Sequence, residues 1–403
     1  MRILLITHET SRTGAPRVAA VVARGLANQG HDVRVEARTR GPLLPEFEAI
    51  APTSLEFLFR ARRRLRNVRG LGFVGFLVDT LQAFCAVLRH RPNLVYVNST
   101  AASIYLRPAR WLRRRVVLHV HESGAIASDF MARARLRTLP SGVEVVACSP
   151  SVKSELLALM PEIADRVHLV PSVPDDASVL RLGNQMAADW DVAHGDLVVG
   201  CCGAIEPRKG VDLWIEAAAQ VRSRIPDARL RFIWIGDGDP PEGVSEQVGV
   251  EFIGPRQNPY PYIHRFDIFT LPSRDDPFPL VVIEAMLLGR PVVAFAVGGV
   301  PQQLGESGVL VPANAVDEFA DSVVRLLGDE QARRGLGERA RDRALTEFST
   351  AAFMNRIDEL IAPAAPARSA GPTGARPDLR TGRPPGRPAG PVSTSEESRS
   401  GGR

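Results

Sequence analysis

Short apolar runs of strand length alternate with longer segments of helical periodicity over most of the chain. This alternation predicts parallel sheets covered by helices, the α/β class. The strands expected in the first half are residues 2–6, 32–35, 94–97, 116–120 and 143–147. A second series is expected at 197–202, 230–235, 250–253, 268–271 and 292–295. Helices are expected at 16–29, 211–224, 280–288 and 317–327.

This order of elements predicts two tandem sheets of the nucleotide-binding type. The stretch from Pro171 to Gly195 begins with several prolines and aspartates, which is typical of a connection between domains. We therefore expect a Rossmann-like domain at residues 1–172, a connection at 173–195 and a second Rossmann-like domain at 196–340. Residues 362–403 are so rich in Pro, Gly, Ala, Arg and Ser that we expect a disordered tail.

The composition fits an ordinary soluble globular protein, with 45% hydrophobic and 24% charged residues in 403. The apolar run after Met1 is too short for a secretory signal. The four cysteines have neither the spacing of zinc ligands nor the density of a disulfide scaffold. A cytoplasmic location is therefore expected.

The formal net charge of +5 is unevenly distributed along the chain. Thirteen arginines but one acid, Asp79, lie between Arg60 and Arg115. Within that segment, apolar residues at helical spacing from Phe73 to Phe84 favour an interfacial or core helix over a spanning one. The arginines favour reversible peripheral contact with an anionic membrane on its inner face, and core packing alone is the alternative. Few aromatic residues interleave with the arginines, which argues against a nucleic-acid partner.

The first loop and the fourth expected strand carry candidate chemistry in the first domain. Gly14 lies just before a helix and could allow close backbone approach to a ligand, although a plain strand–helix turn also explains it. His119 and His121 alternate along a strand and share one side of it, and Glu122 follows. Three interpretations remain open: a metal site, a satisfied polar cluster, or a sugar-binding His121 oriented by Glu122.

The second domain carries the sharper signal. Arg208 and Lys209 lie between glycines in a loop that follows a strand and precedes a helix, which suits a bound diphosphate. Lys209 is one of only two lysines in the chain. An acidic turn ends in Asp276, and Glu284 follows among apolar residues at the start of a helix, where a carboxylate is usually paired or faces a ligand. The Asp237-Gly238-Asp239 sequence is interpreted as a turn and not as a metal site.

Together these motifs resemble the family-4 retaining glycosyltransferases, also described as glycosyl transferases group 1. The resemblance covers roughly residues 1–361 and is carried by the basic loop at 206–210, the acidic motif at 272–286 and the glycine-rich segment at 289–301. It implies the GT-B architecture, in which two Rossmann-like domains face each other across a cleft. The first domain would then lie on the acceptor side, the second would bind the nucleotide sugar, and a helix at 341–361 would pack back toward the first.

The resemblance also implies roles for individual residues. Arg208 and Lys209 would neutralise the donor diphosphate, and Glu284 would accept hydrogen bonds from the ribose. The remaining roles, at the donor and its sugar, would fall to Asp276 beside the sugar, the backbone amides of Phe278 and Leu280, His121 at the transferred sugar, and the Gly14 loop. The expected catalytic residues are His121, Asp276 and Glu284, with no metal and no cofactor.

Four positions depart from the family pattern and bear on the identity of the donor. The family usually has Glu in place of Asp276, Gly in place of Pro279, Glu in place of Gln302 and Arg in place of Ala204. The expected activity is a retaining, metal-independent hexosyl transfer of the kind used in polysaccharide biosynthesis. Its donor would be a nucleoside-diphosphate sugar, of the UDP or GDP type, and its acceptor a cell-envelope, lipid-linked or other glycan. The alternatives are another GT-B enzyme, such as a nucleotide-sugar epimerase, and a non-catalytic module that binds nucleotide sugar or glycan.

Overall fold

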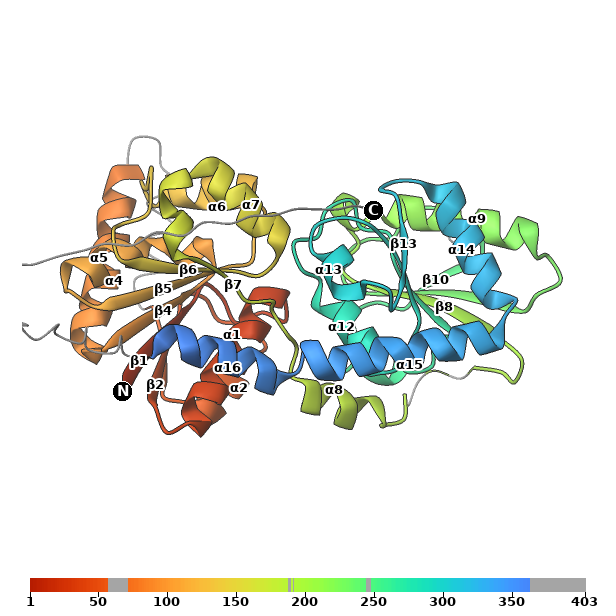
Figure 1. Cartoon of the computed structure of the whole chain (residues 1–403), viewed down its shortest axis with the longest axis horizontal. Coiled ribbons are helices and arrows are strands. Elements are labelled where there is room, and N and C mark those ends of the chain that lie inside the picture. The colour runs from red at the N-terminus through yellow and green to blue at the C-terminus, as the bar shows by residue number, and fades with distance from the viewer. Residues whose placement is uncertain (57–71, 188–189, 191, 244–247, 363–403) are drawn as a thin grey trace, which may run out of the picture. The chain divides into compact units, whose positions relative to one another are not determined.

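The computed structural model describes residues 1–56, 72–187, 190, 192–243 and 248–362. Residues Met1–Ile361 form one compact unit that contains two parallel sheets, each flanked by helices (Figure 1). This arrangement confirms the predicted fold class of two α/β domains. The arginines at positions 60–69 and the tail at 363–403 lie outside the described residues, so the expectations about them stay predictions.

The first sheet has seven strands in the order β3-β2-β1-β4-β5-β6-β7, all paired in parallel. At its centre, β1 pairs with β4 from Ile3 with Leu94 to Thr7 with Asn98. The strands are β1 (Arg2–Thr7), β2 (Asp32–Ala37), β3 (Thr53–Leu55), β4 (Leu94–Asn98), β5 (Arg115–Val120), β6 (Val143–Ala147) and β7 (Val167–Leu169).

Helices with apolar faces cover this sheet. In α1 the buried side chains include Val18, Val22 and Leu26, which recur at helical spacing. In α7, Ser149 caps the first turn by accepting a hydrogen bond from Val152 N. The helical elements are α1 (Gly14–Asn28), α2 (Leu44–Ile50), α4 (Gly72–His90), η1 (Thr100–Tyr105), α5 (Leu106–Trp111), α6 (Gly124–Arg133), α7 (Pro150–Leu159) and η2 (Pro161–Arg166).

The second sheet has six parallel strands in the order β10-β9-β8-β11-β12-β13. These are β8 (Leu197–Cys202), β9 (Leu230–Ile235), β10 (Val250–Phe252), β11 (Ile268–Leu271), β12 (Val292–Phe295) and β13 (Val309–Val311). The helical elements of this half are α8 (Asp176–Gly183), η3 (Pro207–Lys209), α9 (Val211–Arg224), α11 (Tyr260–Ile263), α12 (Leu280–Leu287), α13 (Val300–Leu304), α14 (Val316–Leu327), α15 (Glu330–Glu347) and α16 (Thr350–Ile361).

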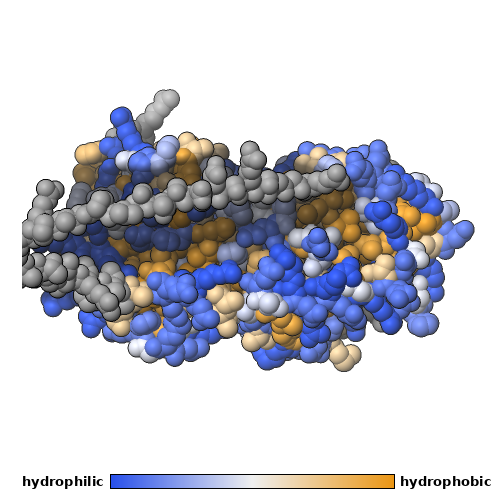
Figure 2. Space-filling model, in the orientation of Figure 1, coloured by the Kyte–Doolittle hydropathy of each residue, from blue (hydrophilic) through white to orange (hydrophobic). Residues whose placement is uncertain are grey.

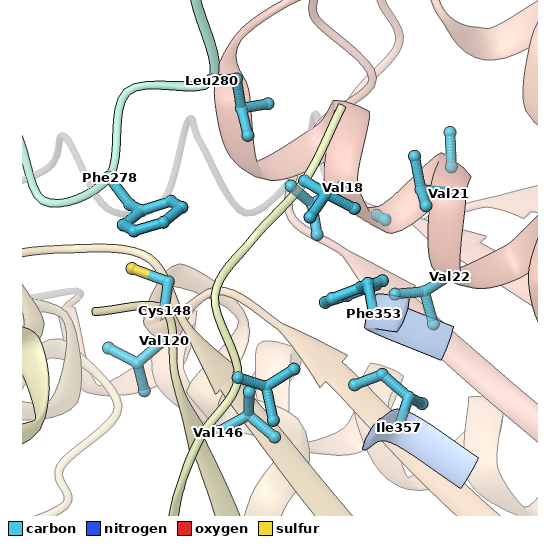
Figure 3. Close-up of a cluster of buried hydrophobic side chains, with 14 of the residues drawn as sticks. Val18, Val21, Val22, Val120, Val146, Cys148, Phe278, Leu280, Phe353 and Ile357 are labelled. Atoms are coloured by element: carbon cyan, nitrogen blue, oxygen red, sulfur yellow. The ribbon is translucent and has the colours of Figure 1, made fainter. Parts of the chain in front are cut away.

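Two hydrophobic cores support the sheets. One lies within the second domain, where Trp214 and Trp234 pack edge to face. The other joins the domains: Phe278 of the second domain lies beside Cys148 of the first, and Phe353 of α16 packs near Val22 of α1 (Figure 3). The loop that carries Phe278 is therefore anchored by contacts with both domains.

The two last helices pass from the second domain to the first. The outer surface of α15 is hydrophilic in the view of Figure 2, whereas Leu336 and Ala340 are buried on its inner side. Helix α16 packs against α1, where a Cβ at Gly25 would lie 2.4 Å from the sulfur of Met354. The expected helix at 341–361 is thus replaced by two helices, because the chain leaves the helical conformation at Phe348.

Several other boundaries differ from the expectations. Helix α1 begins at Gly14, two residues earlier than expected. The connection at 173–195 contains α8, whose N-terminus is capped by Asp175. The short strands β3, β7 and β13 were not expected, and each of them forms an edge of its sheet.

Candidate active site

The C-terminal ends of β8 and β11 lie side by side, because these strands are neighbours in the second sheet. The basic loop follows β8, and the acidic turn follows β11. Glycine is required where the two meet: Gly210 has φ 71°, and a Cβ there would lie 2.0 Å from the carbonyl oxygen of Pro272. Gly298 has φ 52°, and a Cβ there would lie 1.9 Å from the carbonyl oxygen of Asp276. These close backbone approaches fix the acidic turn against its surroundings.

Lys209 and Asp276 form the central ion pair of this corner. Lys209 Nζ donates to Asp276 Oδ2 at 2.6 Å, and both side chains are largely buried. Arg208 is more exposed, and it donates to the carbonyl of Asp275 at 2.9 Å and to Glu206 at 2.7 Å. Its guanidinium is also 3.9 Å from Asp276. Two cations therefore lie at the end of β8, as the sequence predicted.

Glu284 lies in the first two turns of α12, and only 2% of its surface is exposed. Its Oε1 accepts hydrogen bonds from the guanidinium of Arg17 and, at 3.3 Å, from Tyr260 Oη. Arg17 comes from α1 in the first domain, so this ion pair joins the two domains. Burial raises the pKa of Tyr260, and the negative charge of Glu284 raises it further.

The thiol of Cys202, the last residue of β8, is affected by several of these charges. Burial and the charge of Glu284 raise the pKa of its thiol to about 12, while Arg17 and Lys209 act in the opposite direction. Glu284, Arg17 and Lys209 thus all lie within electrostatic range of one side chain at the end of β8. That the cations at 208–209 and the acid at 284 bind one ligand stays a prediction.

The start of α12 offers hydrogen-bond donors to this site. Among the described residues, the backbone amides of Phe278 and Leu280 have no hydrogen-bond acceptor. Their side chains are buried, and the carbonyl oxygen of the intervening Pro279 accepts a hydrogen bond from Gln303 Nε2 at 3.0 Å. Free amides at a helix N-terminus favour an anion.

His121 is held on the first-domain side by two polar side chains. Its Nε2 is 3.0 Å from Asn98 Oδ1, and its Nδ1 is 3.3 Å from Ser172 Oγ. The ring of His119 lies 4.0 Å away, centroid to centroid, as expected for alternate residues of one strand. Burial holds the pKa of His121 well below its ordinary value, and His119 and His8 add to this effect. The imidazole is therefore neutral at neutral pH.

Glu122 does not orient His121, which corrects one of the three interpretations. Its carboxylate accepts hydrogen bonds from the hydroxyls of Ser99 and Thr100 and from the backbone amide of His121, not from the ring. The glutamate turns back toward η1 because Ser99 and Thr100 follow the neighbouring strand β4 directly. Among the described residues, no group of three or more His, Cys, Asp or Glu side chains is placed to hold a metal ion.

The loop that precedes Gly14, residues 8–13, is held by hydrogen bonds within itself. Glu9 accepts hydrogen bonds from Ser11 and Thr13 and lies beside His8, and its pKa falls to about 2, chiefly because of the His8 hydrogen bond. Gly14 itself is exposed, and a Cβ there would meet no atom within 4 Å. Neither its backbone conformation nor its surroundings therefore require glycine, in contrast to Gly210.

Sequence reasoning missed four residues of this region: Arg17, Tyr260, Asn98 and Ser172. Asn98 links the parts of the first domain, because its Nδ2 also donates to the carbonyl of Ala15 at 2.9 Å. The end of β4 was a detectable signal for Asn98, since polar residues at strand ends point to ligand sites. No comparable pattern distinguishes Arg17 from the other 47 arginines.

The chemistry of the site follows from these donors and acceptors. Cations and free amides can bind a phosphate group, and a nearby buried carboxylate can accept hydrogen bonds from hydroxyls. A ligand that carries both a phosphate group and vicinal hydroxyls matches the cations and amides as well as the carboxylate.

Comparison with known families agrees with this chemistry. Residues 12–176 match the family described as Glycosyltransferase Family 4, and residues 196–329 match the family described as Glycosyl transferases group 1. A D-inositol 3-phosphate glycosyltransferase of Corynebacterium aurimucosum is 35% identical over 182 residues, which are 41% of this chain and 43% of the relative. An alpha-D-kanosaminyltransferase of Streptomyces kanamyceticus is 32% identical over 371 residues, which are 81% of this chain and 89% of the relative.

The chain spans about half the length of the inositol-phosphate enzymes that it matches first, and most of the kanosaminyltransferase. The fold is similar to that of Anabaena HepE, whose crystal structure was determined in complex with UDP and glucose. That comparison gives a TM-score of 0.71 at 20% identity and covers 90% of this chain and 99% of HepE.

Proposed function

This chain belongs to the GT-B glycosyltransferases that combine a Family 4 domain with a group 1 domain, and on that premise we propose that it is a family-4 hexosyltransferase acting with retention of configuration. Its donor is a nucleoside-diphosphate sugar, and its acceptor is a glycan, lipid-linked or other cell-envelope molecule. The observation that carries the proposal is the buried ion pair of Lys209 and Asp276 at the adjacent ends of β8 and β11, with the buried carboxylate of Glu284 in the helix that follows β11.

In the proposed complex, the diphosphate lies between the basic loop and the start of α12. Lys209, Arg208 and the amides of Phe278 and Leu280 stabilise the negative charge that grows on the diphosphate as the glycosidic bond breaks. The ribose hydroxyls donate to Glu284. Because fixed cations and amides neutralise the leaving group, the proposed reaction uses no metal ion and no cofactor.

The transferred sugar lies toward the first domain. Neutral His121 offers it a hydrogen bond from a ring held by Asn98 and Ser172, and the Gly14 loop approaches from the same side. Asp276 borders the sugar from the second domain. The acceptor hydroxyl attacks on the face from which the diphosphate departs, so that the anomeric configuration is retained.

Names and ligands of similar proteins support the choice of donor. The relatives described above are named for transfer to inositol 3-phosphate and for transfer of kanosamine, and HepE binds UDP and glucose. UDP is therefore the first nucleotide to test here, with GDP as the alternative.

We include an anionic membrane among the proposed partners because of the exposed side of α4. Five large apolar side chains of this helix are exposed, and they fall along one stripe: Phe73, Val74, Leu77, Leu81 and Leu88. By length and composition alone, the window Phe73–His90 is the one candidate membrane span among the described residues, and a third of it is buried. A helix with one buried side and one exposed apolar side fits the membrane interface better than a span.

The charge around this helix favours an anionic surface. Residues 72–140 contain ten arginines, three acids and no lysine. The guanidinium of Arg135 lies 5.0 Å from the ring of Phe73, which places a cation beside the apolar stripe. Trp111, at the end of the neighbouring α5, is 65% exposed. Such a protein would lie on the cytoplasmic face of the membrane, where a lipid-linked acceptor is accessible.

Sedimentation with lipid vesicles tests the membrane contact. The protein should sediment with phosphatidylglycerol vesicles but not with phosphatidylcholine vesicles, and salt should weaken the binding. The double variant Leu77→Gln/Leu81→Gln should lose it, whereas Leu345→Gln, an equally conservative change at an exposed leucine of α15, should retain it. Equal binding by the double variant would remove the membrane from the proposal.

A thermal-shift panel tests the activity itself. We expect one of UDP, GDP, ADP and TDP to raise the melting temperature selectively, and its sugar conjugates to be consumed when an acceptor is present. Lys209→Ala should lose the shift, whereas Lys153→Ala, at the other lysine, should keep it. Consumption of the donor without any acceptor would indicate a hydrolase or epimerase instead, and no shift with any nucleotide would end the proposal.

A further inference from the structure

The contact between Arg17 and Glu284 uses one carboxylate oxygen and leaves the other open. Arg17 Nη2 and Tyr260 Oη both donate to Oε1 of Glu284. Among the described residues, Oε2 accepts no hydrogen bond. The carboxylate is thus held from one side by donors of two different domains, while its second oxygen has its acceptor capacity unused.

Burial makes these two donors necessary. Glu284 is 2% exposed, and a buried carboxylate without donors is strongly disfavoured. Burial by itself lowers the pKa of Arg17, but the charge of Glu284 and its hydrogen bond raise the pKa above the ordinary value, so the guanidinium stays charged. Tyr260 Oη lies 2.6 Å from the same nitrogen and closes a triangle of three polar groups.

Arg17 starts from a firmly held backbone. Its helix turn includes the buried Pro16, and the carbonyl of Ala15 accepts the hydrogen bond from Asn98. The charge of Arg17 also acts to lower the pKa of Cys202. Cys202 lies two residues before Ala204, the position where the related enzymes usually have an arginine. A side chain of the first domain therefore contacts the buried carboxylate of the second.

We propose that Arg17 is a positioning residue for the nucleoside of the donor. By holding Oε1 together with Tyr260, it turns Oε2 of Glu284 toward the ribose hydroxyls, and it makes nucleoside recognition depend on both domains. This inference rests on the proposed function, because it takes Glu284 as the ribose-binding group. It adds a residue that lies outside the sequence motifs. It also assigns separate roles: Arg17 supports binding of the nucleoside, and Lys209 binds the diphosphate.

Calorimetric titration with two probes separates these roles. The probes are the nucleoside diphosphate that stabilises the wild-type protein and inorganic pyrophosphate, which lacks a ribose. Arg17→Ala should weaken binding of the nucleotide roughly ten- to a hundred-fold, the range expected when a charge-assisted hydrogen bond is lost, and should leave pyrophosphate binding unchanged. Lys209→Ala should weaken both.

Matched variants exclude a mere loss of domain contact. Arg12 also joins the domains, through a 2.7 Å hydrogen bond to the carbonyl of Gln257, yet it does not touch Glu284. Arg12→Ala should bind both probes within about twofold of wild type. Arg17→Lys, which keeps a charge at this position, should recover part of the nucleotide affinity, and Tyr260→Phe should lose a few-fold. These two variants carry the test if Arg17→Ala does not fold.

The outcomes are distinguishable. If the wild-type protein binds no nucleotide, the proposed function fails. If it binds and Lys209→Ala loses both probes, but Arg17→Ala and Tyr260→Phe bind the nucleotide as wild type does, only the role of Arg17 fails. Tighter nucleotide binding by Arg17→Ala would show that the arginine competes with the ribose, and weaker pyrophosphate binding would make it a phosphate ligand. Either result overturns the positioning role.

Discussion

Lys209 and Asp276 are 67 residues apart in sequence, yet their side chains form a largely buried ion pair of 2.6 Å at the joint end of β8 and β11. A buried cation that already has an acidic partner can take on a phosphate without leaving it, because an ammonium has three donors. In the proposed complex, the carboxylate of Asp276 would balance the charge of the lysine before the donor binds and would border the sugar afterwards.

This pairing leads to a split prediction for Asp276→Asn. The variant keeps the shape of the side chain but removes a negative charge beside the diphosphate, so the nucleoside diphosphate should bind at least as tightly as to wild type. Turnover of the sugar donor should fall by roughly ten-fold or more, since a group bordering the reacting sugar is altered. Binding by calorimetry and initial rates check the two parts.

The adjacent Asp275 provides the control for this change. Asp275→Asn also removes one negative charge, but only the backbone carbonyl of Asp275 contacts Arg208. Its turnover should stay within about twofold of wild type. Weaker nucleotide binding by Asp276→Asn than by Asp275→Asn would contradict the role given to the ion pair.

Two glycines should respond in opposite ways to the same substitution. Gly14→Ala should leave the melting temperature unchanged, because a Cβ there meets nothing within 4 Å, and should lower turnover if the loop approaches the donor sugar. Gly210→Ala should lower the free energy of unfolding by about 1–3 kcal/mol or more, since it has φ 71° and faces the Pro272 carbonyl. Thermal denaturation and donor turnover measure both. Full activity of Gly14→Ala would place the ligand away from this loop.

The buried histidines should make the folded state less stable in mild acid. Burial lowers the pKa of His119 to about 3, whereas a histidine in the unfolded chain titrates near its ordinary pKa of about 6.5. Below about pH 6.5 the unfolded state therefore binds a proton that the native state does not, and stability falls by about 1.4 kcal/mol per pH unit for each such histidine. Urea denaturation between about pH 5 and 7.5 measures this slope.

The variant His119→Asn gives this prediction its control. It should lower the stability at every pH. The slope of its unfolding free energy against pH should be smaller than that of the wild type by about 1.4 kcal/mol per pH unit, which corresponds to one proton. An unchanged slope would mean that His119 titrates alike in both states.

Metal removal is expected to have no effect on the reaction. In the proposed mechanism, Lys209, Arg208 and the amides at the start of α12 supply the positive charge that the departing diphosphate requires. Donor turnover in excess EDTA should therefore equal turnover in added Mg²⁺ or Mn²⁺, measured at one ionic strength. A loss of activity in EDTA that is restored by either cation would assign the diphosphate to a metal.

The sequence predicted the elements best where strands are buried on both faces. Residues 292–295 are a continuous apolar run, residues 268–271 are one interrupted only by Thr270, and the structure has strands with these same bounds. The strands that were not expected have three residues each, and β3 and β13, at sheet edges, are only partly buried. Such short, half-exposed segments leave little period-two pattern to detect.

The site was predictable where its residues share a local motif. Arg208, Lys209 and Asp276 lie in short segments that follow strongly apolar strands, and Glu284 lies among apolar residues of α12. A lysine is also rare in this chain. Arg17 and Glu284 meet across 267 residues and two domains. That contact depends on how the domains pack, which no local pattern encodes. The orientation of His121 likewise depends on Asn98 and Ser172, from neighbouring parts of the fold.

A structure of the protein with the stabilising nucleoside diphosphate bound tests the central claim most directly. The account predicts that the ribose hydroxyls lie within hydrogen-bond distance of the Glu284 carboxylate and that a phosphate oxygen contacts Lys209 Nζ. A nucleotide bound elsewhere, or one whose phosphates lie away from Lys209 while Glu284 faces no ribose, would contradict it.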